Sequence, residues 1–127
     1  MKLLQRKIDK ILRDWKQTEN KMPLIVKGAR QIGKTASIMQ FATENYKNVI
    51  AINFVLQKKY KAIFDDSYEV EDIVRNITLI DPSLNFEAGN TLIFFDELQD
   101  CPACATSLKA FCIDGRYDVI CSGSLMG

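Results

Sequence analysis

One eight-residue segment, GARQIGKT from Gly28 to Thr35, constrains the fold of this chain more than any other feature. It matches the pattern G-x-x-x-x-G-K-[ST] in full. It follows the short apolar run Leu24–Val26 and precedes a segment, from Lys34 to about Tyr46, with apolar residues at helical spacing. A glycine-rich turn between a buried strand and a helix directs backbone N–H groups and the positive end of the helix dipole at one point, which suits a phosphate group.

Each residue type of this turn has a physical role in phosphate binding. The glycines let the backbone come close to the ligand and adopt positive φ. We expect Lys34 to bring a positive charge to the β and γ phosphates and Thr35 to offer a hydroxyl to Mg²⁺. We expect nine consecutive residues to bind the nucleotide: Gly28, Ala29, Arg30, Gln31, Ile32, Gly33, Lys34, Thr35 and Ala36. The competing interpretation is a glycine-rich turn with a surface lysine.

A second pattern consists of four apolar residues, Leu92–Phe95, followed by the carboxylates Asp96 and Glu97. Acidic residues at the C-terminal end of a buried strand lie where ligands bind in open α/β sheets. We expect Asp96 to hold Mg²⁺ through water, because Mg²⁺ keeps much of its hydration. We expect Glu97 to orient and polarise the attacking water. Taken alone, the same residues are also compatible with a solvated strand end.

Apolar segments of strand length alternate with helical segments, which predicts a parallel sheet with helices on its faces. The predicted strands are Leu24–Val26, Val49–Val55, Thr91–Phe95 and Tyr117–Cys121. The predicted helical segments are residues 1–20, 34–46, 58–64, 70–79 and 103–111. One strand separates the glycine-rich turn from the Asp-Glu pair, as in the P-loop NTPases that have an additional strand and a catalytic Glu. The expected fold is therefore an α/β, three-layer α/β/α P-loop NTPase with a parallel sheet of about four strands.

The first 20 residues have the pattern of an amphipathic helix. Apolar side chains recur at helical spacing in Leu4, Ile8, Ile11, Leu12 and Trp15, with charged residues between them. We expect Trp15 to pack in the core, although stacking on adenine is an alternative. The chain stops a few residues after the fourth predicted strand, so we expect a P-loop core that continues in a longer protein.

The composition excludes several classes of protein. The chain is 47% hydrophobic and 26% charged, as ordinary globular domains are. Its longest apolar runs are about four residues, far short of the roughly 20 that a membrane helix needs. The first residues, MKLLQRKIDK, contain no apolar signal-peptide region, so we expect a cytoplasmic protein. The chain has no histidine, which excludes His-based catalytic triads and metal sites.

Charge is distributed unevenly along the chain. Residues 1–61 carry fourteen Lys and Arg against four Asp and Glu, whereas residues 62–127 carry three against twelve. A basic half can face nucleic acid or a membrane surface. No aromatic residues are interleaved with the basic ones as stacking platforms, so the favoured interpretation is a solvated basic part packed beside an acidic part.

The four cysteines stand at positions 101, 104, 112 and 121. Structural zinc sites usually combine two short C-x₂₋₄-C units, and the second pair here is spaced too widely for that. We therefore expect reduced structural thiols without a metal.

Three segments together, GARQIGKT, FFDELQDCP and RYDVICSGSLMG, resemble the bacterial and archaeal AAA-type ATPases that carry a C-terminal domain of unknown function. The resemblance extends over essentially all 127 residues, which would form the N-terminal, nucleotide-binding portion of such a protein. It implies a sheet in which the strand before the glycine-rich turn lies beside the Ser122 strand, followed by the Asp96 strand and then Val49–Val55. It also implies that Ser122 or Ser124 senses the γ-phosphate.

These observations favour an ATPase that uses ATP and Mg²⁺. Glu97, Lys34 and Ser122 are the expected catalytic residues, and Thr35 and Asp96 the expected metal ligands. The alternative is a module that binds nucleotide as a switch for a protein or DNA partner and turns over negligibly. A kinase is a third, weaker possibility, because no acceptor pocket is evident in the sequence.

Overall fold

The structure is a computed structural model that describes residues 2–28 and 33–124, with side chains from Arg6 onward in that part. The elements follow in the order α1 (Lys2–Lys16), β1 (Leu24–Lys27), α2 (Lys34–Asn45), β2 (Asn48–Asn53), η2 (Lys58–Phe64), α3 (Val70–Ile80), β3 (Thr91–Asp96), η3 (Leu98–Asp100), α4 (Pro102–Asp114) and β4 (Asp118–Gly123). Helices and strands alternate as the sequence predicts, and η2 is a 3₁₀ helix.

The four strands form one parallel sheet with the order β1-β4-β3-β2. This is the order that the resemblance implied, with β4 inserted between β1 and β3. Strand β3 lies at the centre of the paired region, and its residues Thr91–Phe95 are all buried. A continuous apolar run is expected of a parallel strand that is covered on both faces.

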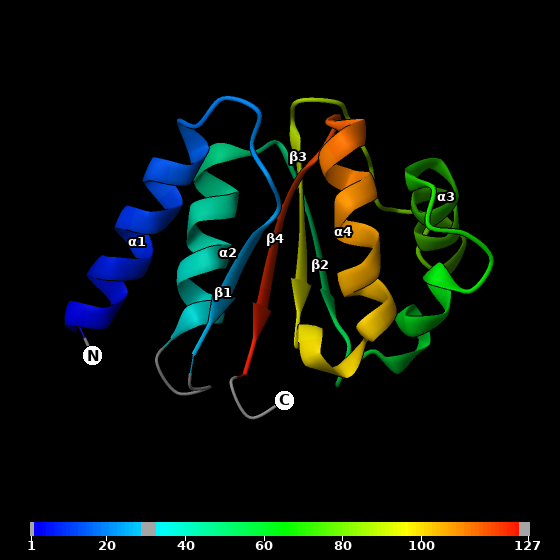
Figure 1. Cartoon of the computed structure of the whole chain (residues 1–127), viewed down its shortest axis with the longest axis horizontal. Coiled ribbons are helices and arrows are strands. Elements are labelled where there is room, and N and C mark those ends of the chain that lie inside the picture. Colours follow the sequence, from blue (N-terminus) through cyan, green and yellow to red (C-terminus); the bar gives the residue numbers. More distant parts are fainter. Residues whose placement is uncertain (1, 29–32, 125–127) are drawn as a thin grey trace.

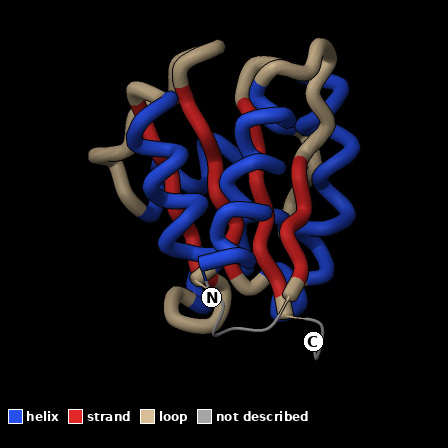
Figure 2. Tube along the Cα trace, turned by 90° about the vertical axis from the view of Figure 1, so that its left-hand side faces the viewer, coloured by secondary structure: helices blue, strands red, loops and turns tan. Residues whose placement is uncertain are grey.

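Helices cover both faces of the sheet and complete a three-layer α/β/α arrangement (Figures 1 and 2). Successive side chains of β3 point to opposite faces. Leu92 and Phe94 pack in the core beneath α1 and α2. Ile93 and Phe95 pack in the second core, beneath α3, α4 and η2. The expected P-loop NTPase fold is therefore confirmed.

Helix α1 differs from the expectation in two respects. It ends at Lys16 rather than near Asn20, and Asn20 itself adopts a left-handed conformation with φ 54°. Ile8 and Leu12 are buried, but Ile11 is 48% exposed, because the contact with α2 covers a narrower stripe than the predicted apolar face. Leu4 lies outside the residues with described side chains. Across residues 2–28 and 33–124, no helix is long and apolar enough to span a bilayer.

Trp15 anchors the end of α1 to the core. Its indole Nε1–H donates to the carbonyl oxygen of Met22 at 2.8 Å. Its ring lies 6.4 Å from that of Phe41 on α2, measured between centroids. These contacts match the core-packing interpretation of Trp15.

A polar network joins α1, α2 and β4 at the N-terminal edge of the sheet. The hydroxyl of Tyr46, directly after α2, donates to Asp118 at the start of β4. Lys21 Nζ lies 3.6 Å from the same carboxylate oxygen, and Lys16 Nζ lies 4.0 Å from it. Burial and the bond to the Asp118 carboxylate raise the pKa of Tyr46 well above its usual range, so this tyrosine stays a donor. The network holds the sheet edge that faces away from the strand ends expected to bind nucleotide.

We expect Tyr46→Phe to lower the free energy of unfolding by about 1.5–3 kcal/mol, the contribution of a hydrogen bond to a charged group. Urea denaturation of wild type and variant measures this difference. Tyr68→Phe is the matched control, since Tyr68 is 45% exposed and its replacement should cost less than about 0.5 kcal/mol. Equal stabilities for the two variants would contradict a stabilising role for the network.

Candidate functional site

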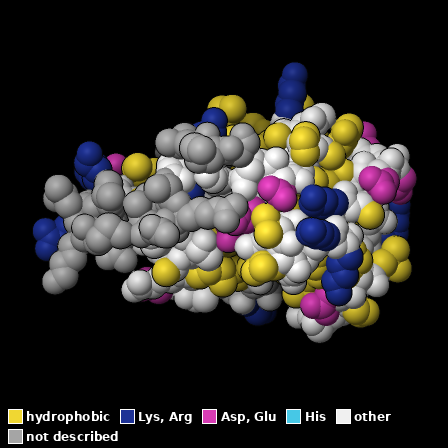
Figure 3. All heavy atoms as spheres, turned by 90° about the horizontal axis from the view of Figure 1, so that it is seen from below, with side chains coloured by type: hydrophobic (Ala, Val, Ile, Leu, Met, Phe, Trp, Pro, Cys, Tyr) yellow, Lys and Arg dark blue, Asp and Glu magenta, His cyan; other side chains and the backbone are white. Residues whose placement is uncertain are grey.

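The carboxyl ends of the four strands meet at one edge of the sheet, at the bottom of Figure 1. Asn53 of β2 pairs with Asp96 of β3, and Asp96 pairs with Ser122 of β4. Three polar residues therefore stand in a row across neighbouring strands. Figure 3 views the molecule from this edge, where acidic side chains lie close to Lys and Arg side chains.

The described part of the glycine-rich turn has the backbone that its sequence requires. Gly33 precedes α2 in a left-handed conformation with φ 76°. This conformation is unfavourable for any residue that has a Cβ atom. The carbonyl oxygen of Gly33 accepts the Ser37 N–H at 3.0 Å, an early backbone bond of α2. The first four N–H groups of any helix have no acceptor within it, so the helix start that contains Thr35 and Ala36 can receive an anion. Four expected binding residues lie outside the described residues: Ala29, Arg30, Gln31 and Ile32.

Lys34 connects the ends of β1 and β4. Its side chain is 5% exposed. Its Nζ donates to the carbonyl oxygen of Gly28 after β1, at 2.8 Å, and to that of Gly123 at the end of β4, at 2.7 Å. A lysine ammonium has three donors and is strongly hydrated, so burial requires that it be held by acceptors such as these.

Asp96 lies beside Thr35 at the end of β3. Its Oδ2 accepts the Thr35 hydroxyl at 3.1 Å and the Asn53 amide at 3.5 Å, and its Oδ1 accepts the backbone N–H of Glu97 at 2.9 Å. Burial raises the pKa of Asp96 above its usual value, and the charge of Glu97 adds to the rise. The bonds from Thr35 and the Glu97 N–H and the charge of Lys34 oppose it. A carboxylate and a hydroxyl in contact form the oxygen donor set that Mg²⁺ prefers.

Glu97 adopts a left-handed backbone conformation, with φ 59° and ψ 50°. Such a conformation costs a residue with a side chain about 1–3 kcal/mol and is often found at functional sites. The conformation lies directly before η3, whose Gln99 donates from Nε2 to Glu97 Oε1 at 2.9 Å. The local strain thus coincides with the expected catalytic carboxylate.

A pocket of about 270 Å³ unites these side chains. It is lined by Lys34, Thr35, Asn53, Asp96, Glu97 and Ser122. Ser122 is almost fully buried and lines this pocket, whereas Ser124 lines a neighbouring one beside β1 and η3. Of the two serines left open by the sequence, Ser122 is therefore the one beside the expected catalytic residues.

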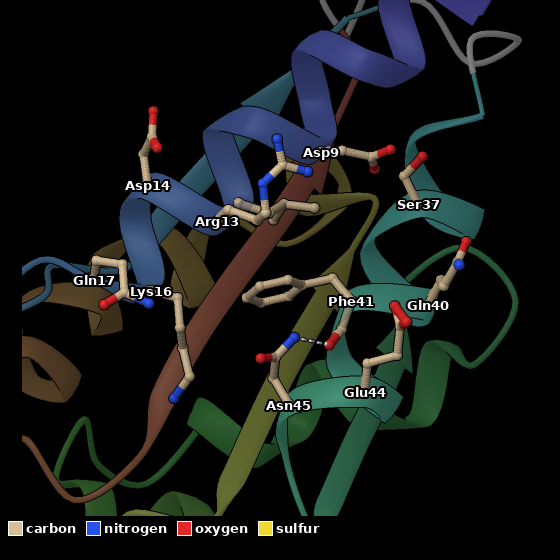
Figure 4. A pocket seen from close by; sticks show the side chains of 11 residues that line it. Asp9, Arg13, Asp14, Lys16, Gln17, Ser37, Gln40, Phe41, Glu44 and Asn45 are labelled. Atoms are coloured by element: carbon tan, nitrogen blue, oxygen red, sulfur yellow. Dashed lines mark hydrogen bonds between the residues drawn. The ribbon is translucent and has the colours of Figure 1, made fainter.

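A larger pocket, of about 680 Å³, lies between α1 and α2 (Figure 4). Its labelled side chains include both acidic and basic groups, among them Asp9, Arg13 and Glu44. None of the residues that the sequence predicts to bind phosphate or metal lines it. Pocket size alone would thus have pointed away from the strand ends.

Two residues of the site were not predicted from the sequence. Asn53 ends β2 at the same edge as Asp96, and its position at a strand end is a signal that could have identified it. Gln99 follows Glu97 by two positions in η3, and no spacing rule singles it out.

All four cysteines are free thiols. Burial is the main cause that raises the pKa of Cys101 and Cys104, so both remain protonated. In the part of the chain that the structure describes, no group of three or more Cys, His, Asp and Glu side chains could hold a metal ion.

Comparisons with known proteins add the following findings. A family model described as an AAA domain matches residues 20–127. No curated protein sequence matches the chain. A solved structure of PCH-2 from C. elegans matches 98% of this chain with a TM-score of 0.50 and 13% sequence identity, a likeness of fold alone. The chain spans 37% of the length of that PCH-2 chain.

We expect Asp96→Asn to raise the free energy of unfolding at neutral pH in the absence of nucleotide. A carboxyl whose pKa is raised by folding stabilises the protein while it is protonated, and this contribution is lost as the pH rises through the raised pKa. The neutral amide avoids that loss, so the advantage of the variant should disappear at acidic pH. Urea denaturation at several pH values measures this.

Asp81→Asn is the control with the opposite sign. Hydrogen bonds from the side chain and backbone of Ser83 lower the pKa of Asp81, so its ionised form favours folding above the usual pKa of Asp. This variant should be less stable than wild type at neutral pH. A loss of stability in Asp96→Asn at neutral pH would contradict the electrostatic assignment.

Proposed function

The chain belongs to the AAA-domain family, and on that basis we propose that it binds ATP with Mg²⁺ and hydrolyses the bond to the γ-phosphate. One observation carries the proposal: Lys34, Thr35, Asp96, Glu97 and Ser122 line a single pocket at the carboxyl edge of the sheet. The nucleotide-binding domain that we propose spans residues 1–127, with α1 preceding the P-loop core.

Binding would use the backbone of residues 28–36 and the ammonium of Lys34. The turn and the start of α2 offer N–H groups to the phosphates. Lys34 Nζ already lies between the carbonyl oxygens of Gly28 and Gly123, at the ends of β1 and β4, which supports this role. Contact with a phosphate oxygen would replace a carbonyl acceptor by an anion, which makes a stronger hydrogen bond.

Thr35 and Asp96 would hold Mg²⁺, Thr35 through its hydroxyl and Asp96 through water. Their present hydrogen bond of 3.1 Å, which brings the two side chains into contact, supports this role. When bound, Mg²⁺ neutralises negative charge that develops on the phosphate oxygens. Ser122, in register with Asp96, would contact the γ-phosphate from β4.

Glu97 would act as the base in hydrolysis. A water oxygen forms a bond to the γ-phosphorus while the bond from that phosphorus to the bridging oxygen of ADP breaks. The proton lost by the water passes to the Glu97 carboxylate, and ADP and inorganic phosphate are the products. Glu97 lines the same pocket as Lys34 and Thr35, which supports this role.

The alternative, a nucleotide-dependent interaction module for a protein or DNA partner, is favoured by a different observation. Four basic side chains of α1 are exposed, namely Arg6, Lys7, Lys10 and Arg13. An anionic partner could bind there without any turnover. Hydrolysis measurements separate the two proposals.

We expect Lys34→Ala to weaken ATP binding by roughly 10- to 150-fold, which corresponds to losing a hydrogen bond of about 1.5–3 kcal/mol to a charged group. Titration with a fluorescent ATP analogue and Mg²⁺ measures the affinity. Lys109→Ala, an exposed lysine on α4, is the control and should bind like wild type. Equal affinities for the two variants would remove Lys34 from the site.

We expect Glu97→Gln to retain ATP while turnover falls by about 10²- to 10⁴-fold, because the amide preserves shape but cannot take up the proton. Steady-state phosphate release and ATP titration on the same preparations measure both quantities. If wild type bound ATP and released phosphate no faster than Glu97→Gln, the interaction module would be the better proposal.

A further inference from the structure

The carboxylate of Glu97 is held by a side chain to which the proposed reaction assigns no role. Gln99 donates from Nε2 to Glu97 Oε1 at 2.9 Å. At its other end, Gln99 Oε1 accepts the backbone N–H of Ser124 at 3.1 Å. Because the amide is bonded at both ends, its plane is fixed, and with it the direction from which Glu97 receives a hydrogen bond.

Gly123 makes this approach possible. It is buried at the end of β4, and a Cβ on it would lie 3.1 Å from Gln99 Oε1 and 3.7 Å from the Cβ of Leu98. A contact of 3.1 Å is tighter than most real Cβ contacts, so a side chain here would push the Gln99 amide aside. The absence of a side chain at position 123 therefore leaves room for the Gln99 amide in its observed position.

The peptide group between Gly123 and Ser124 connects Gln99 to Lys34. Its carbonyl oxygen accepts from Lys34 Nζ at 2.7 Å, and its N–H donates to Gln99. A peptide group is planar and turns as one unit, so the two bonds cannot change independently. A cation at the carbonyl also polarises the N–H and strengthens its bond to Gln99.

We propose that Gln99 is a positioning residue that sets the direction of the Glu97 carboxylate and couples it, through the Gly123–Ser124 peptide, to Lys34. When Lys34 turns toward a phosphate, its bond to the Gly123 carbonyl weakens, and the longer bond from the Gly28 N–H, at 3.3 Å, still holds that carbonyl. The peptide then turns more easily than when Lys34 is bound to it. The amide of Gln99 follows, and Glu97 takes its working orientation only when the phosphate site is filled. This inference rests on the proposed ATPase function.

The test uses Gln99→Met, which keeps the length of the side chain and removes both hydrogen bonds. We expect kcat to fall by about 10- to 100-fold, as small misplacements of catalytic groups do, while the Kd for ATP changes by less than about twofold. Gln40→Met on the exposed face of α2 is the matched control and should leave both constants unchanged. Gly123→Ala, which crowds the Gln99 amide without removing it, should lower kcat in the same direction.

A double-mutant cycle distinguishes positioning from a merely structural role. Without the carboxylate there is nothing to position, so Gln99→Met should add no further loss to the residual turnover of Glu97→Gln. An equal fold-loss in both backgrounds would show that Gln99 acts on the fold and would overturn the inference. Normal kcat in Gln99→Met would overturn it too, with the ATPase function intact. A wild-type protein without turnover would overturn the function and the inference together.

Discussion

Parallel pairing in a fixed register is the constraint on which the rest of this structure depends. Both faces of the sheet are buried, so a slip by one residue would move Ile93 and Phe95 into the core that Leu92 and Phe94 occupy. The same register aligns the strand ends and sets Asp96 beside Ser122. The arrangement of polar groups at the edge is thus determined by the packing of the apolar residues that precede them in the strands.

Much of the fold could be predicted because its signals are local. The turn before Lys34 and the apolar run before Asp96 each identify a strand end by composition, and two such ends in a parallel sheet must share an edge. The sheet order came instead from the resemblance to a family, since periodicity does not determine which strands are neighbours. Ile11 was misplaced because an apolar residue beside a helical stripe is buried only if the partner helix reaches it. Asn53 and Gln99 join the site through contacts with residues of other strands and turns. Sequence periodicity does not predict such contacts.

The candidate site contains locally unfavourable interactions, and favourable interactions elsewhere in the domain compensate for their free-energy cost. Glu97 has a left-handed backbone, and two acidic groups stand in sequence next to each other with Asp96 half-buried. At the opposite edge, Tyr46, Lys16 and Lys21 surround Asp118 with favourable partners. Unfavourable backbone and charge interactions therefore occur at the expected site, whereas the opposite edge has favourable ones. Such a division is common in proteins with functional sites.

The position of β4 in the sheet affects the order in which the strands can pair during synthesis. Strand β4 follows β1, β2 and β3 in the chain but lies between β1 and β3 in the sheet. During synthesis, β2 and β3 can pair early, whereas β1 must wait for residues near 120 to emerge, which is a contact of long sequence separation. Until then Lys34 cannot donate to the carbonyl oxygen of Gly123. The insertion of β4 between β1 and β3 therefore completes the sheet and, in the same step, brings the Gly123 carbonyl to Lys34. The fold and the arrangement of the expected phosphate-binding lysine are completed together.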